Sequence, residues 1–199
     1  MEETKDGLRS ATLKRRSALS PATCFSWSRL IQTKTLELPQ YLAARSVALY
    51  RAAQNEVETG ALMDHALRQR KKVFYPQFSG KEPAVFAQVF SEQDLIPGPL
   101  GVAEPSGDTR LSQADAETLM VIVPGVLFDC RGNRLGRGGG WYDRALRWLG
   151  GRGVYVGLAY EFQVVDGVPV QSWDEKVHYV ITESRVIDCE FASQREIVW

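Results

Sequence analysis

Residues 119–149 read LMVIVPGVLFDCRGNRLGRGGGWYDRALRWL, and this stretch decides the fold class. It opens with a continuous apolar run over 119–123, which is typical of a strand buried on both faces. It closes with residues 141–149, where apolar side chains recur at helical spacing and form one stripe. A buried strand, a loop and an amphipathic helix in this order form the repeating unit of α/β proteins.

The same alternation continues on both sides of that stretch. Residues 5–45 are predicted to be helical, with a start at Ser20-Pro21, because Ser caps helices and Pro suits their first position. Pro39 is expected to break this helical pattern, and Pro76 to stop a strand. Further helix is expected over 60–71, and short apolar runs predict strands at 47–50, 73–75, 85–89, 154–160 and 179–182. The pattern therefore predicts an α/β layer fold around a largely parallel sheet.

Composition limits the possible classes of protein. The 199 residues suit one large domain covering 1–199, and 44% of them are hydrophobic, which is enough for a substantial core. Lys plus Arg and Asp plus Glu both number 24, so the formal net charge is zero. A duplex-binding protein usually carries a basic surplus, so we expect no nucleic-acid partner.

Cysteines and apolar runs bear on the location of the protein. Cys24, Cys130 and Cys189 are odd in number and widely spaced, which fits neither a disulfide framework nor a zinc site. No run approaches the roughly 18–20 apolar residues that span a bilayer. We therefore expect a cytoplasmic monomer without a membrane partner.

The glycine-rich loop at residues 136–140 carries the clearest chemistry. Glycine lets the backbone approach a ligand, and the helix that follows presents free N–H groups and a positive dipole end. Together with Arg134 and Arg137, these features predict a phosphate site, at which Asp143 could hold Mg²⁺. The loop is neither a Walker A motif nor a dinucleotide fingerprint, since Trp141 replaces the last small residue and no predicted strand directly precedes the loop. An exposed glycine-rich linker and an RNA-binding Arg-Gly fragment are alternative interpretations.

The longer pattern over residues 124–144, PGVLFDCRGNRLGRGGGWYDR, resembles the signature of the 5-formyltetrahydrofolate cyclo-ligase family. Shorter segments resemble further motifs of that family in the same order along the chain. They are Lys5 with Leu8-Arg9, residues 55–59 (NEVET), Tyr75-Pro76, residues 101–105 (GVAEP), Val168-Pro169, Trp173-Asp174 and Thr182. The resemblance implies a three-layer αβα fold with a largely parallel central sheet, of the Rossmann-like kind (NagB/RpiA/CoA transferase-like).

The resemblance also implies an activity and its residues. The family closes 5-formyltetrahydrofolate to 5,10-methenyltetrahydrofolate with ATP and Mg²⁺, releasing ADP and phosphate. It implies catalytic roles for Arg137 and Tyr142, a substrate contact through Glu56 and again Tyr142, and Mg²⁺ ligands at Asp143 and Asp174. The ATP-binding residues that it implies are Lys5, Arg9, Arg134, Leu135, Gly136, Arg137, Gly138, Gly139, Gly140, Trp141 and Tyr142.

Some features depart from the family pattern and leave alternatives open. Gly139 stands where some members carry Lys, Trp173 replaces a residue of the C-terminal motif, and residues 80–89 lack an expected Met-x-Phe. Of these features, only the missing Met-x-Phe favours one alternative, a paralogue that uses the same ATP site for another substrate. Others are an RNA-binding protein and a phosphosugar isomerase, although the isomerase would need an acid–base pair that the sequence does not suggest. Trp141 could stack on a ligand ring or belong to the core.

Overall fold

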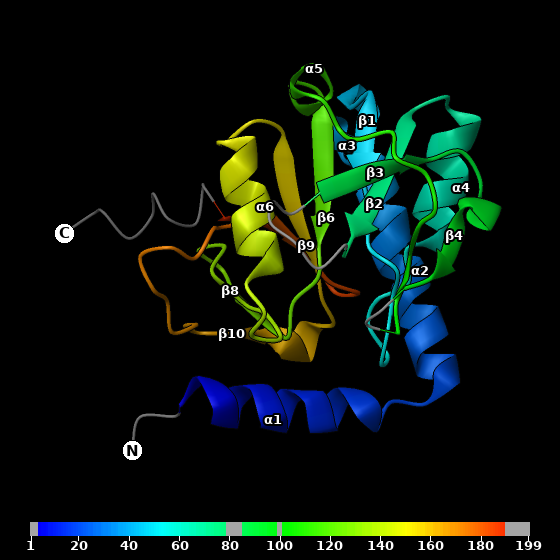
Figure 1. Ribbon diagram of the computed structural model, residues 1–199. Coiled ribbons are helices and arrows are strands. Elements are labelled where there is room, and N and C mark those ends of the chain that lie inside the picture. Colours follow the sequence, from blue (N-terminus) through cyan, green and yellow to red (C-terminus); the bar gives the residue numbers. More distant parts are fainter. Residues whose placement is uncertain (1–3, 79–84, 99–100, 190–199) are drawn as a thin grey trace.

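The computed structural model describes residues 4–78, 85–98 and 101–189. Its main sheet has seven strands in the order β12-β11-β9-β6-β1-β2-β3 (Figure 1). The inner strands β11, β9, β6, β1 and β2 are parallel, and the edge strands β12 and β3 pair antiparallel to their neighbours. The bounds are β1 Ser46–Ala48, β2 Lys72–Gln77, β3 Val85–Val89, β6 Leu119–Val123, β9 Val154–Leu158, β11 Tyr179–Ile181 and β12 Val186–Asp188. The largely parallel sheet expected from the sequence is confirmed.

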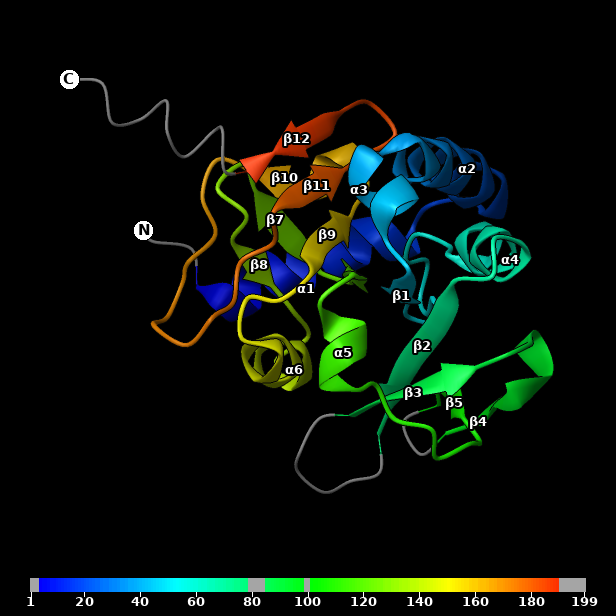
Figure 2. The same cartoon turned by 90° about the horizontal axis from the view of Figure 1, so that it is seen from above.

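Helices cover both faces of this sheet, as Figure 2 shows. One face packs on α2 (Pro21–Glu37), α3 (Pro39–Ala43) and α4 (Gly60–Arg68), and the other on α5 (Gln113–Ala116) and α6 (Trp141–Leu149). Within β6, Met120 and Ile122 enter the first core and Val121 and Val123 the second. Both faces of the strand are therefore buried, which explains its unbroken apolar sequence and confirms the three-layer αβα arrangement.

The predicted helical region 5–45 is divided into three helices. The first, α1 (Lys5–Ser17), crosses the molecule below the carboxyl ends of the strands (Figure 1). Ser20 caps α2 through a bond from the Thr23 amide at 3.1 Å, as predicted. Pro39 follows the end of α2 and takes the first position of α3. Among the described residues, no helix combines the length and the apolar character that a membrane crossing requires.

Two predictions about strands were wrong. Pro76 does not stop β2, which continues to Gln77. Pro76 faces the same side as Phe74, whose carbonyl accepts the bond from the Leu49 amide, but β1 ends at Ala48. On that side the pairing with β1 has ended, and β2 continues through its antiparallel pairing with β3 on the other side, where Gln77 is opposite Val85. The glycine loop does follow a strand directly, because β8 (Arg134–Leu135) ends where the loop begins.

Strand β8 belongs to a small second sheet, β10-β7-β8, in which β7 (Leu127–Asp129) pairs antiparallel with β8 and β10 (Val164–Val165) pairs with β7. A third sheet joins β4 (Leu95–Pro97) and β5 (Ala103–Pro105), and short 3₁₀ turns lie at η1 (Glu92–Asp94) and η2 (Glu161–Gln163). Phe128 of β7 is fully buried against two glycines. A Cβ on Gly157 would lie 2.4 Å from its ring and one on Gly125 2.5 Å from it. This close approach fixes the β7–β8 hairpin to the main sheet.

Asp129 shapes the tip of this hairpin. Its carboxylate is 0% exposed and accepts bonds from the Arg131 and Asn133 amides at 2.9 and 3.0 Å. It also accepts from the Asn133 side chain at 2.8 Å and from the Val168 amide at 3.0 Å. The carboxylate thus organises the turn that leads into β8 and ties it to the segment after β10.

We predict that Asp129→Ala lowers the free energy of unfolding by about 3–5 kcal/mol, because several buried donors lose a charged acceptor. Urea denaturation of the purified variant measures this loss. The exposed Asp108→Ala serves as the control and should stay within about 0.5 kcal/mol of the parent. A loss below about 1 kcal/mol for Asp129→Ala would show that the hairpin does not depend on this carboxylate.

Candidate active site

A pocket of about 610 Å³ opens at the carboxyl ends of β1 and β6. These strands are neighbours, but the chain leaves them in opposite directions. After β1 it turns to α4 on one face and continues to β2, and after β6 it turns to α6 on the other face and continues to β9. A reversal of this kind leaves a crevice between the two loops, which is where open α/β sheets bind ligands.

The glycine loop forms one wall of the pocket and enters α6 with an unusual backbone. Gly138 has φ 104° and Gly140, the N-cap of α6, has φ 62°, and side chains are rarely tolerated at either angle. No side chain caps the N-terminus of α6. The first N–H groups of the helix are thus left without a side-chain acceptor beside the pocket, as an anion site requires.

Cations surround this loop and are bonded to the loop itself or to carboxylates. The Arg9 Nε donates to the Gly136 carbonyl at 2.9 Å, which holds α1 under the loop. Arg134 is only 4% exposed, and its Nη2 donates to the Asp143 Oδ1 at 2.7 Å. The Lys5 ammonium lies 3.2 Å from the Asp174 Oδ2. All of these residues line the same pocket, so the structure brings together the predicted phosphate-binding cations.

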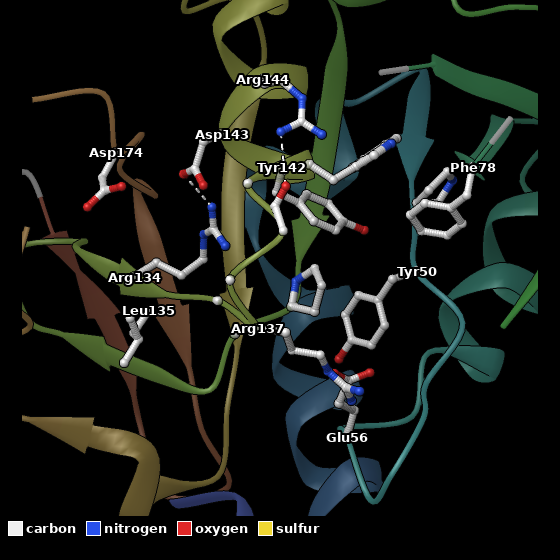
Figure 3. A pocket seen from close by; sticks show the side chains of 18 of the residues that line it. Tyr50, Glu56, Phe78, Arg134, Leu135, Arg137, Tyr142, Asp143, Arg144 and Asp174 are labelled. Atoms are coloured by element: carbon white, nitrogen blue, oxygen red, sulfur yellow. Dashed lines mark hydrogen bonds and ion pairs between the residues drawn. The ribbon is translucent and has the colours of Figure 1, made fainter. Parts of the chain in front are cut away.

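The opposite wall is the loop between β1 and α4, which presents Glu56. Two residues of this loop, Gln54 and Asn55, have left-handed φ angles of 51° and 58°. The Asn55 amide group holds the turn by donating to the Arg16 carbonyl at 3.1 Å. The Glu56 carboxylate accepts from the Ala53 amide at 3.1 Å and from the Arg137 Nη2 at 2.9 Å. Arg137 thus reaches from the glycine loop to Glu56, and Figure 3 shows the two side chains together.

Tyr142 lies in the first turn of α6, with its ring facing the pocket (Figure 3). Its hydroxyl is buried and has no hydrogen-bond partner among the described residues. Burial raises the pKa of Tyr142, and the nearby Glu56 carboxylate raises it further. The phenol therefore stays protonated at neutral pH and can donate a hydrogen bond to a ligand.

Asp143 and Asp174 are the predicted Mg²⁺ ligands, and both line the pocket beside Arg134 (Figure 3). The described residues contain no group of three or more acidic, His or Cys side chains that would form a metal site by themselves. Two carboxylates beside a phosphate site nevertheless fit Mg²⁺, which proteins commonly bind through one or two carboxylates together with substrate phosphates. The donor set thus fits a metal that is held jointly with a nucleotide.

Other predicted residues have a second, structural contact. Leu135 borders the pocket but is buried in a small cluster with Val126, Leu127 and Val168. Trp141 packs against the rings of Phe86 and Phe78, with centroids 5.1 and 5.3 Å away, so the core alternative describes part of its environment. The departure at residues 80–89 falls largely on residues 79–84, which lie outside the described part of the chain.

The residues at the site that sequence analysis missed include Arg16, Tyr50 and Phe78. Tyr50 and Phe78 line the pocket, and Arg16 lies beneath Glu56. A signal for Arg16 was available, because Lys5, Arg9 and Arg16 are spaced by four and seven residues. This spacing puts all three on one face of α1. It was hidden by the neighbouring cations Lys14 and Arg15, which are exposed.

The chain is similar in sequence to known proteins. The chain is 33% identical over 181 residues to the 5-formyltetrahydrofolate cyclo-ligase of Escherichia coli (strain K12), covering 87% of this chain and 97% of that protein. It is 30% identical over 193 residues to the protein of the same name from Mus musculus, covering 92% and 95% respectively.

Similar structures include the NMR structure of Aquifex aeolicus 5,10-methenyltetrahydrofolate synthetase, with a TM-score of 0.81 and 34% identity over 93% of this chain and 92% of that chain. A 5,10-methenyltetrahydrofolate synthetase from Mycoplasma pneumoniae shares the fold, with a TM-score of 0.73 and 24% identity over 92% and 99% of the two chains. The family pattern itself matches residues 1–183. The chain therefore belongs to the 5-formyltetrahydrofolate cyclo-ligase family.

Proposed function

We propose that this protein uses ATP to close 5-formyltetrahydrofolate to 5,10-methenyltetrahydrofolate, with release of ADP and phosphate. The observation that carries the proposal is the pocket at the carboxyl edge of the sheet. It combines a glycine loop at an uncapped helix N-terminus with the carboxylate of Glu56 on the facing wall. The first wall suits a triphosphate, and the second suits the N–H donors of a pterin ring.

The chemistry explains why a nucleotide and a folate must share one pocket. The formyl group on N5 is an amide, and its oxygen is a poor leaving group. Transfer of the γ-phosphoryl group to that oxygen breaks the bond to ADP and forms an O-phosphorylated amide, an iminium phosphate in which the carbon stays bonded to N5. N10 then attacks the formyl carbon, the C–O bond breaks, phosphate leaves with the oxygen, and N10 loses its proton. The protein has to align the two substrates and neutralise charge, since this transfer needs no covalent help.

Each wall has a separate task in this proposal. The N–H groups of residues 136–140, with Lys5, Arg9, Arg134 and Arg137, bind the phosphates, and Leu135 and Trp141 border the nucleotide. Glu56 fixes the pterin ring by accepting its N–H donors, and Arg137 lies between the two substrates, where it can stabilise the transferred group. Tyr142 donates its hydrogen bond toward the reacting groups. Bound by Asp143 and Asp174, Mg²⁺ would neutralise phosphate charge.

The geometry does not favour the RNA-binding alternative. Arg134 is buried against Asp143, and Arg137, whose side chain is 41% exposed, already donates to Glu56, Gln54 and the Ala53 carbonyl. The proposed site takes residues from Lys5 to Asp174 of one chain, which supports a single domain over 1–199 that works as a monomer. The scattered cysteines support a cytoplasmic location.

The test mixes purified protein with MgATP and 5-formyltetrahydrofolate and follows the methenyl product by its near-ultraviolet absorbance. A rise in absorbance that requires ATP supports the proposal. No rise, from protein that is shown separately to bind ATP, would contradict it and favour a paralogue with another substrate.

Replacement of Glu56 tests the pterin wall. We predict that Glu56→Gln raises the KM for 5-formyltetrahydrofolate by about tenfold to a hundredfold, because a hydrogen bond to a charged group contributes about 1.5–3 kcal/mol. The KM for ATP should not rise, since Arg137 loses a competing partner. Steady-state kinetics of this variant and of the exposed control Glu58→Gln measure both constants. An increase confined to the KM for ATP would contradict the prediction, because Glu56 would then contribute to binding ATP and not the folate.

Replacement of Asp143 tests the metal ligand. We predict that Asp143→Asn lowers kcat by about a hundredfold or more and raises the Mg²⁺ concentration needed for half-maximal rate. Titration of Mg²⁺ at saturating substrates measures both effects. Because Asp143 also pairs with buried Arg134, the unfolding midpoint is recorded in parallel, with the exposed Asp166→Asn as the control. An unchanged Mg²⁺ requirement would mean that Asp143 serves only as the partner of Arg134.

A further inference from the structure

Arg16 is a buried cation directly beneath the proposed substrate wall. It lies near the end of α1 and its side chain is only 1% exposed. Its Nε donates to the Gln54 carbonyl at 3.1 Å and its Nη1 to the Gly125 carbonyl at 3.3 Å. These carbonyls belong to the two loops that follow β1 and β6, so one guanidinium joins both walls of the crevice.

The third nitrogen of this guanidinium faces Glu56. Nη2 donates no hydrogen bond within the described residues, and it lies 3.7 Å from the Glu56 Oε1. Burial lowers the pKa of Arg16, and Glu56 opposes this change. Arginine nevertheless remains protonated in proteins, so a positive charge persists under the carboxylate. A buried cation retained at such a desolvation cost needs a compensating partner, and Glu56 is that partner.

Glu56 therefore lies between two arginines that differ in freedom. Arg137 is on the glycine loop and its side chain is 41% exposed, so a nucleotide phosphate can draw it away from Glu56. Arg16 is enclosed and bonded to two backbone carbonyls, so a nucleotide phosphate cannot draw it away from Glu56.

We infer that Arg16 is a positioning residue for the folate substrate: it orients the Glu56 carboxylate and keeps a positive charge beside it when Arg137 turns to the phosphates. This inference rests on the proposed function, in which Glu56 accepts the N–H donors of the pterin. Arg16 itself touches no substrate and acts through Glu56. If Arg16 only held the two loops together, its replacement would raise the KM for the folate by the same factor with and without the Glu56 carboxylate.

The experiment is a double-mutant cycle of Arg16→Met and Glu56→Gln, with KM measured separately for 5-formyltetrahydrofolate and ATP. Arg16→Met should raise the KM for the folate by about tenfold or more and the KM for ATP by less than about twofold. In the Glu56→Gln background the same change should raise the folate KM by less than about twofold. Arg16→Lys, which keeps the charge, should recover part of the loss. The control is Arg15→Met, because Arg15 is exposed on the same helix.

Equal losses in both backgrounds, or an Arg16→Met variant that behaves like Arg15→Met, would overturn the inference. The unfolding midpoints of the same four proteins give a second cycle if Arg16→Met folds poorly. Removing Arg16 alone leaves the Glu56 charge without its buried partner, so the midpoint should fall less in the Glu56→Gln background. If the decreases in midpoint caused by the two replacements were additive, the inference would be overturned as well. A wild-type protein that forms no methenyl product would refute the proposed function instead, and the unfolding cycle would still decide whether Arg16 acts through Glu56.

Discussion

Three ion pairs hold the carboxyl edge of the sheet together, namely Lys5 with Asp174, Arg134 with Asp143 and Arg137 with Glu56. Two of them join segments that are far apart in the chain, and the third binds the start of α6 to β8. In the free protein three of the four cations proposed to hold phosphate are thus paired with a carboxylate that could hold Mg²⁺ or a pterin, and the fourth, Arg9, is paired with Asp6. Partly buried charges of one sign would repel one another, so this pairing lets α1, the glycine loop and the loop after β1 close around one crevice.

The same pairing explains how the proposed reaction could begin. A triphosphate brings negative charge to Lys5, Arg134 and Arg137 and so competes with their carboxylates. Asp143 and Asp174 are then released to hold a cation, and Glu56 to accept the pterin. Arg16 differs from Arg137, the other arginine beside Glu56, because it is enclosed and bonded to two backbone carbonyls. This exchange of ion-pair partners, from carboxylate to phosphate, takes place within one pocket, on loops that the sheet already holds in place.

The sequence predicted those helices and strands whose periodicity and end signals lie within their own residues. The strand at 119–123 and the helix at 141–149 were predicted with the observed bounds, because their periodicity and their ends at Pro124 and Gly150 are local signals. Pro76 was misjudged because β2 continues past it through its pairing with β3, which depends on a neighbouring strand and not on the local sequence. The small sheet β10-β7-β8 has strands of two or three residues, too short to show a period. Arg16 was missed because burial selects one arginine from three adjacent cations, and only the packing of α1 reveals which one.

In the proposed reaction the pocket passes a phosphoryl group from ATP to the formyl oxygen of the folate. The most direct measurement uses 5-formyltetrahydrofolate labelled with ¹⁸O in the formyl group, with mass analysis of the inorganic phosphate after a single turnover. We expect the label in the phosphate, because the C–O bond breaks when N10 closes the ring. Unlabelled phosphate formed together with the methenyl product would contradict it, since ATP would then have been cleaved without activating the formyl oxygen.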